Sequence, residues 1–362
     1  MKKSIVSLCL IVLSQGAAAF MVSVPLETPL LLFPLGFATG STSGHEEITR
    51  QAMNRLESNL LRIGIDAAKL SPEFLGGRDV NILSTHGLNT PNMIIKGNYS
   101  TDMPSELIEI FNIPEFHDQP LAGWTNNPNI QVLHFLRNID PKDGSLYSQF
   151  DTCVQAKEKI IKSTLEGVKR WIADDQKSAL FLFGHATHTI QDSFSHAHTL
   201  RDKDSNNSDL LKVCYYGPMR NTSPDACYHQ MIDTRDDIWF SNPINFINKV
   251  SILIPLEKTK EGNLKAEAKL ARTATMRYLF LVATFIHDNK LNGDLNETQL
   301  IQTLNKKLFE GLTGMTAVDQ GEVAPVSNLK MPMPNGIIRC ERLSRKVDSG
   351  ELLSTTNKSA PH

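Results

Sequence analysis

Histidines and a carboxylate are concentrated between Ser178 and His198, in the sequence SALFLFGHATHTIQDSFSHAH. At about 100° per residue, four of these side chains fall within an arc of about 80° on one helical face: His185, His188, Asp192 and His196. His188 and Asp192 are four residues apart, so their side chains can share one ion. A lone histidine on such a helix is more often a hydrogen-bonded core residue. Four histidines and an aspartate in so short a stretch favour a buried metal site instead.

A second candidate histidine occurs at the start of the first predicted helix. Ser43-Gly-His-Glu46 fits a capping box, with Ser43 as the N-cap and Glu46 three residues later. This places His45 in the first turn, beside backbone N–H groups that have no helical partner. The apolar stripe that follows at helical spacing consists of Ile48, Ala52, Leu56 and Leu60.

Other helices must pack around the histidine-rich one, and apolar periodicity predicts them. Asp174 or Asp175 is expected to cap the histidine-rich helix itself. No convincing strand alternation occurs, so the predicted fold class is all-α. The further predicted helices are 151–173, about 264–288, about 296–311 and a short one at 105–111.

The N-terminus predicts export. Residues 1–19 read as a secretory signal peptide, with two lysines, an apolar run and three alanines that form an A-x-A cleavage site. Residues 20–43 are apolar and rich in proline, and the prolines prevent a spanning helix of about 20 residues. We therefore expect a soluble, secreted mature protein.

The rest of the chain divides into a predicted helical domain at 44–312 and an irregular C-terminal tail at 313–362. Within the domain, residues 64–130 are rich in proline and glycine and are expected to form long loops. Long irregular segments in a compact domain are usually functional or disordered. This one carries His86, Asp102, His117 and Asp118.

Export changes how the cysteines are interpreted. Without Cys9, an even number remains in an oxidising compartment, which allows two disulfides. Cys214 and Cys227 bracket a polar segment, so we expect them to pair locally, and Cys153 then pairs with Cys340. No Cys-x-x-Cys pair occurs, so a thiolate zinc site is not supported.

Charge and motifs argue against several function classes. The formal net charge is −2 and there is no basic tract, so electrostatics give no support to a nucleic-acid partner. The sequence contains neither Gly-x-Ser-x-Gly nor Gly-x-x-x-x-Gly-Lys, which argues against a serine hydrolase and a phosphate-binding loop. A chain of this length can bury a core without metal, so a metal here would be catalytic rather than structural.

The ordered histidines and aspartates carry a resemblance to a known family. His188-x-x-x-Asp192, then His198 six residues after the aspartate, then His229-x-x-x-Asp233, resembles the zinc-dependent phospholipase C and single-strand nuclease superfamily. The members of that superfamily are all-helical enzymes with three zinc ions at the bottom of a cleft. The resemblance implies a compact multi-helix domain with long loops and two to three zinc ions.

Outer motifs extend the resemblance over residues 44 to 235. Leu133-His134-Phe135 is similar to the segment that presents an earlier zinc-binding histidine in the nucleases, and Gly44-His45 is similar to the near-N-terminal histidine. The Gly97-Asn-Tyr-Ser-Thr-Asp102 segment resembles a Gly-Asn-x-x-x-Asp element of related exported phospholipases and of heterokaryon-incompatibility proteins.

Carried over by position, the resemblance implies a complete ligand set. One zinc would be held by Asp102, His134 and His188, with Asp192 bridging to another that His45 also binds. The remaining zinc would be held by His198, His229 and Asp233. A free carboxylate edge of Asp102 would accept the proton of the attacking water.

One implied ligand has a rival, and two features depart from the family pattern. Asp118 rivals Asp102, because its spacing to His134 is closer to that of the nucleases. His196 stands where many relatives have proline, so it competes with His198. In the family an N-terminal tryptophan ligates one zinc, but no tryptophan precedes His45 here.

The resemblance favours an exported zinc phospholipase C that hydrolyses glycerophospholipids to diacylglycerol and a phospho-headgroup. The expected partner is phospholipid at a membrane or micelle surface, with neither a nucleic acid nor a stable protein partner. A zinc-dependent single-strand nuclease is the alternative, for which Trp124 and Tyr215-Tyr216 could stack a base. A non-catalytic, zinc-stabilised interaction protein is the third interpretation.

Overall fold

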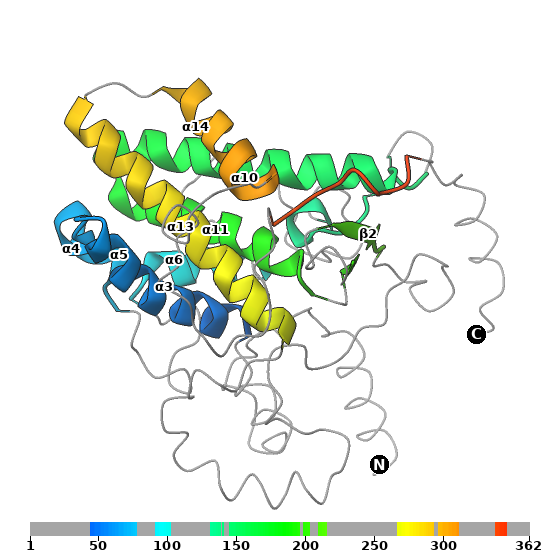
Figure 1. The fold of residues 1–362 in the computed structure, drawn as a ribbon, viewed down its shortest axis with the longest axis horizontal. Helices are drawn as coiled ribbons and strands as arrows, with labels where there is room; N and C mark the ends of the chain where they lie inside the picture. Colours follow the sequence, from blue (N-terminus) through cyan, green and yellow to red (C-terminus); the bar gives the residue numbers. More distant parts are fainter. Residues whose placement is uncertain are drawn as a thin grey trace, which may run out of the picture.

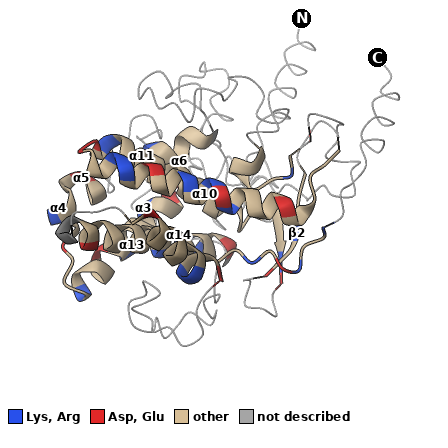
Figure 2. Cartoon of the chain, turned by 90° about the horizontal axis from the view of Figure 1, so that it is seen from above, with Lys and Arg blue, Asp and Glu red and all other residues tan. Residues whose placement is uncertain are grey.

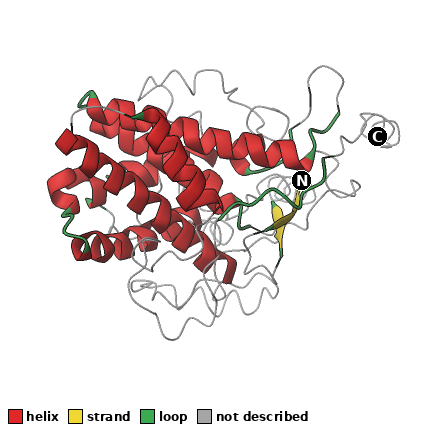
Figure 3. Ribbon diagram, turned by 45° about the horizontal axis from the view of Figure 1, so that its top comes forward, coloured by secondary structure: helices red, strands yellow, loops and turns green. Residues whose placement is uncertain are grey.

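The computed structural model describes residues 44–77, 91–102, 131–138, 140, 145–195, 198–202, 209–215, 266–292, 296–310 and 337–345. These residues are mostly helical, as the periodicity predicted (Figures 1 and 3). The α-helices are α3 (Gly44–Arg62), α4 (Ala67–Leu70), α5 (Pro72–Leu75), α6 (Met93–Asp102), α10 (Gln149–Ile172), α11 (Gln176–Asp192), α13 (Ala266–Asn292) and α14 (Glu297–Thr303). A 3-10 turn, η3, covers Val132–His134, and a π-helical turn, η5, covers Leu304–Glu310.

The histidine-rich helix α11 is the centre of the described fold. It packs against α6, α10, α13 and α3, and every residue from Ser178 to Asp192 is buried (Figure 1). Asp175 is its N-cap and accepts a hydrogen bond from the Ser178 N–H. Asp174, at φ 65°, ends the preceding helix α10 in the left-handed conformation and lets the chain turn back.

Two glycines allow α6 and α11 to touch through their backbones. A Cβ at Gly97 would lie 1.9 Å from the Phe181 carbonyl oxygen, and one at Gly184 would lie 2.0 Å from the Ile94 carbonyl oxygen. Neither backbone oxygen can move aside as a flexible side chain could. The close approach brings the main chain of α6 within reach of the histidines on α11.

The expectation of long loops throughout 64–130 is wrong for the described part of that range. Helices α4, α5 and α6 lie within it, and the Asn92 side chain caps α6 by accepting from the Ile95 N–H. Glycine and asparagine at 97 and 98 disfavour a helix by propensity, but burial against α11 outweighs that cost. The predicted helix at 105–111 lies outside the described residues.

Helix α3 follows the predicted stripe: Ile48, Ala52, Leu56 and Leu60 are all fully buried. It begins at Gly44 and packs mainly on α13. Ser43, the serine of the predicted capping box, lies outside the described residues. The helices predicted at 151–173 and 264–288 correspond to α10 and α13, and the one at 296–311 to α14 followed by η5.

A small antiparallel sheet follows α11 and was not expected from the sequence. Strand β1 (Thr199–Arg201) pairs with β2 (Leu210–Val213), with Thr199 opposite Val213 (Figure 3). Strands of three and four residues are too short to show an alternating pattern. The hairpin starts directly after His198 and so anchors that histidine.

The predicted disulfide between Cys153 and Cys340 is present and ties the C-terminal segment 337–345 to α10. The same segment pairs with β2, because the Leu210 N–H donates to the Arg339 carbonyl. Cys214 is also disulfide-bonded, but Cys227, its predicted partner, lies outside the described residues.

Basic and acidic residues are interspersed along the described helices (Figure 2). Among these helices, none combines the length and the apolar character needed to cross a membrane. The predicted signal peptide, the proline-rich segment and most of the tail lie outside the described residues.

Candidate metal centre

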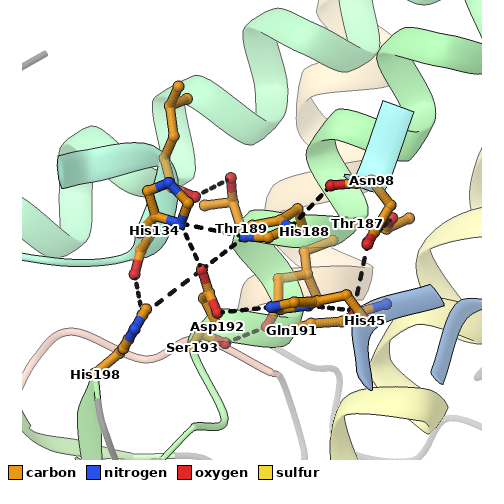
Figure 4. A network of polar contacts seen from close by, with 12 residues as sticks. His45, Asn98, His134, Thr187, His188, Thr189, Gln191, Asp192, Ser193 and His198 are labelled. Carbon is orange, nitrogen blue, oxygen red and sulfur yellow. Dashed lines mark hydrogen bonds and ion pairs between the residues drawn. The ribbon is translucent and has the colours of Figure 1, made fainter. Parts of the chain in front are cut away.

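A buried cluster of His45, His188 and Asp192 could hold a metal ion, because one ligand atom of each lies within 4.8 Å of the others. His188 and Asp192 come from the last turns of α11, and His45 comes from the first turn of α3. All three side chains are at most 2% exposed. Figure 4 shows the three side chains converging between the two helices.

The two oxygens of the Asp192 carboxylate face different histidines. The His188 Nε2 atom lies 3.0 Å from Oδ2, which confirms that the i, i+4 pair meets, whereas the His45 Nε2 atom lies 3.3 Å from Oδ1. The carboxylate therefore stands between two rings and could contribute one oxygen to each of two ions.

His134 extends the cluster on the Oδ2 side. Its Nδ1 atom is 3.1 Å from Asp192 Oδ2 and 3.2 Å from His188 Nε2. With metal–nitrogen and metal–oxygen bonds of about 2.0–2.1 Å, two ligands of a tetrahedral zinc ion lie about 3.3 Å apart. The three atoms form a triangle close to that size, and nitrogen and oxygen donors suit zinc.

Backbone carbonyls fix which nitrogen of two rings carries the proton. The Nδ1 atom of His188 lies 3.0 Å from the carbonyl oxygen of Asn98 on α6, and Nδ1 of His198 is hydrogen-bonded to the carbonyl oxygen of His134. A carbonyl can only accept, so both Nδ1 atoms carry the hydrogen and both Nε2 atoms carry a lone pair instead. This is the arrangement typical of histidines that ligate a metal.

His198 lies at the edge of the cluster, on the segment that leads into β1. Its Nδ1 atom is 3.6 Å from Asp192 Oδ2, and its ring is buried. The Cys214 N–H donates to its carbonyl, and the Arg137 N–H donates to the carbonyl of Cys214. The disulfide-bonded Cys214 thus connects the main chains that carry His134 and His198.

Burial and neighbouring charges favour the protonation states in which Asp192 and His198 could bind a metal ion. Burial by itself would raise the pKa of Asp192, but His198, His188 and His45 lower it well below its usual value. Burial lowers the pKa of His198 to about 4, with Asp192 opposing and His134 reinforcing the shift. A metal ligand must be an ionised carboxylate or a neutral imidazole, and these shifts favour both.

His185 does not join the cluster, although it shares a predicted helical face with His188. Its Nδ1 atom is 2.5 Å from the Thr101 hydroxyl on α6. Burial, followed by the charges of His188 and His134, lowers the pKa of His185 well below the usual value. The ring therefore links α11 to the end of α6 as a neutral group.

The structure brings together five of the eight ligands implied by the resemblance: His45, His134, His188, Asp192 and His198. Asp102 is the last residue of α6, but its side chain lies outside the described part. His229 and Asp233 lie outside the described residues, as do the rivals Asp118 and His196.

Sequence reasoning missed the residues that hold the ligands in place. Asn98 provides the carbonyl that orients His188, Gln191 contacts His45, and the Thr189 hydroxyl donates to the Leu133 carbonyl at 2.7 Å. The last contact fixes η3, which carries His134. For Gln191 and Thr189, the available signal was the mostly polar stretch Thr187 to Ser193, in which Ile190 is the one apolar residue, after the apolar first turns of the helix.

Comparisons of the chain with protein-family models, with curated proteins and with solved structures found no match.

Proposed function

We propose that this protein is an exported, metal-dependent phosphodiester hydrolase that acts as a phospholipase C on glycerophospholipids. The supporting observation is the buried cluster of four imidazoles around the Asp192 carboxylate. Its members follow one another in the chain in the order that the zinc phospholipase C and nuclease superfamily shows. The proposal includes the fold of that superfamily, a compact multi-helix domain with long loops.

The ligand set would hold two to three zinc ions. When bound, zinc neutralises the non-bridging oxygens of a phosphodiester and lowers the pKa of water towards about 7. Asp192 would bridge two ions, one with His134 and His188 and one with His45. His198 would hold a further ion with His229 and Asp233.

The chain's own residues would handle the proton. Hydrolysis forms a bond from the water oxygen to phosphorus and breaks the bond from phosphorus to the glycerol oxygen. Asp102, at the end of α6, would accept the proton from water, and the departing glycerol oxygen takes up a proton as diacylglycerol leaves. Helix α11 would keep the ligands rigid throughout, because it is buried along its whole ligand-bearing half.

Two observations favour lipid over single-stranded nucleic acid. The net charge is −2, and loss of the two lysines of the predicted signal peptide would leave it near −4, which does not attract a polyanion. Tyr215, one of the aromatic residues that a nuclease would need, is only 4% exposed and cannot offer its ring to a base. Trp124 and Tyr216 lie outside the described residues.

The test measures zinc content together with hydrolysis of a panel of phospholipids and of single-stranded DNA. We expect two to three zinc ions per chain and release of a phospho-headgroup that chelation abolishes. His188→Ala and Asp192→Ala should lose both metal and activity. His287→Ala is the matched control, because that histidine is part-exposed on α13 and outside the cluster.

If the protein cleaves single-stranded DNA efficiently and cleaves no lipid, the proposed phospholipase function is wrong and the nuclease function takes its place. Bound zinc without either activity would favour the non-catalytic interaction protein.

A further inference from the structure

We propose that Gln191 is a positioning residue that makes His45 a metal ligand by fixing the tautomer of its ring. The side chain is fully buried at a point where four helices meet. It belongs to α11 and contacts His45 and Thr49 of α3, Asn98 of α6 and Thr275 of α13. The inference rests on the proposed metal centre and is independent of the substrate.

Every hydrogen-bonding position of the Gln191 amide is used. Its Nε2 atom donates to the hydroxyls of Thr49, at 2.8 Å, and Thr275, at 3.2 Å. Its Oε1 atom lies 2.7 Å from His45 Nδ1 and accepts from Asn98 Nδ2 at 3.4 Å. A primary amide offers two donors and one oxygen with two lone pairs, so none is left over.

The orientation of this amide is anchored on two backbone carbonyls. The Thr49 hydroxyl donates its only hydrogen to the His45 carbonyl at 2.9 Å, so towards Gln191 it can only accept. The Thr187 hydroxyl likewise donates to the Gly184 carbonyl at 2.6 Å, so it accepts from Asn98 Nδ2. Turning the Gln191 amide over would place its NH₂ group against that of Asn98. The oxygen therefore faces His45 (Figure 4).

The consequence for His45 follows from its two ring nitrogens. Since Gln191 Oε1 can only accept, Nδ1 of His45 carries the hydrogen and Nε2 keeps its lone pair. Nε2 is the atom that faces Asp192 Oδ1 at 3.3 Å, where an ion would lie. In the other tautomer an Nε2–H would donate to Asp192 and occupy that position. Gln191 excludes this competing hydrogen bond.

Replacing Gln191 tests the inference through metal affinity, measured by competition with a chromophoric zinc chelator. Gln191→Leu removes the acceptor, and we expect the affinity of the zinc ion at His45 to fall about 10- to 100-fold. Gln191→Glu keeps an acceptor for the Nδ1–H and should retain that ion. Gln51→Leu is the matched control, because Gln51 is a buried glutamine of α3 bonded to Glu47 and Arg272, away from the cluster.

A double-mutant cycle separates positioning from general damage. If Gln191 acts through His45, then Gln191→Leu should cause no further loss of zinc affinity in a His45→Ala background. An equal loss in both backgrounds, or unchanged affinity in Gln191→Leu, would overturn the inference.

A measurement on the unaltered, metal-free chain does not depend on how the variants fold. Histidine-selective ¹⁵N NMR should show His45 with its hydrogen on Nδ1, and a hydrogen on Nε2 would contradict the inference. If the wild-type protein binds no zinc, the proposed metal centre itself is refuted. Zinc binding without lipid hydrolysis would leave Gln191 in its role and defeat only the proposed function.

Discussion

At the scale of single residues, Asp192 defines the candidate site, because each oxygen of its carboxylate faces a different imidazole. A buried carboxylate is costly unless it is paired, and this one is held ionised by the histidines around it. Those histidines are themselves oriented by carbonyl and amide oxygens. The hydrogen bonds that orient His45 and His188 are thus made by the ring nitrogen that does not face the Asp192 carboxylate.

Acid should destabilise the metal-free protein. Burial lowers the pKa of His198 to about 4 and that of His185 well below its usual value, so the unfolded chain binds protons first as the pH falls. Stability should therefore decline from about pH 6.5 towards pH 4, at up to about 1.4 kcal/mol per pH unit for each histidine. The pKa of Asp192 is also lowered, and the stability that this contributes is lost only when the pH falls below the ordinary pKa of an aspartate. It therefore does not offset the loss caused by the histidines.

Urea unfolding in the presence of chelator, compared at pH 7 and pH 5, checks this expectation. His185→Asn should reduce the difference between the two, because it removes one of the protons taken up on unfolding. Equal stability of the unaltered chain at both values would refute the assignment of neutral buried histidines.

At the scale of the elements, the site depends on the contact between α6 and α11. Without side chains at Gly97 and Gly184, the Asn98 carbonyl can reach His188 Nδ1. The same contact lets His185 reach Thr101. The close packing of α6 on α11 therefore also orients the candidate ligand His188.

Gly184→Ala should separate these helices. The new Cβ would lie 2.0 Å from a backbone oxygen that cannot rotate away, so we expect a loss of at least about 3 kcal/mol in the free energy of unfolding. Gly64→Ala is the control: no atom lies within 4 Å of its Cβ, and its φ of 83° alone should cost about 1 kcal/mol. Chemical denaturation measures both. Similar losses in the two variants would show that the helix contact is not close.

At the scale of the whole molecule, the disulfide between Cys153 and Cys340 joins parts of the chain that are 187 residues apart. It secures the segment that pairs with β2, and β2 in turn pairs with the strand that follows His198. The C-terminal segment therefore supports, through the hairpin, the part of the candidate site that contains His198.

Replacing both cysteines by alanine should destabilise the protein without removing its core ligands. Closure of so long a loop contributes about 4 kcal/mol, which corresponds to a fall in Tm of roughly 10 °C. Calorimetry of the double variant and the parent, both with zinc, measures the shift. An unchanged Tm would indicate that the hairpin and the C-terminal segment hold together without the bridge.

The sequence by itself determined the features that depend on local spacing. The i, i+4 step from His188 to Asp192 and the stripe on α3 follow from helical periodicity, and both are present. The pairing of Cys153 with Cys340 followed from the expected export of the chain and from the expected local pairing of the other two cysteines, and it is also present.

Only the tertiary structure decided how the distant parts meet. α6 was interpreted as loop because its glycine and asparagine disfavour a helix in isolation, whereas burial against α11 stabilises it. The roles of Asn98 and Gln191 depend on hydrogen bonds between four helices, which no local pattern encodes. Spacing selects which residues share a face, but the tautomers of His45 and His188 are set by the acceptors that neighbouring helices place against their rings.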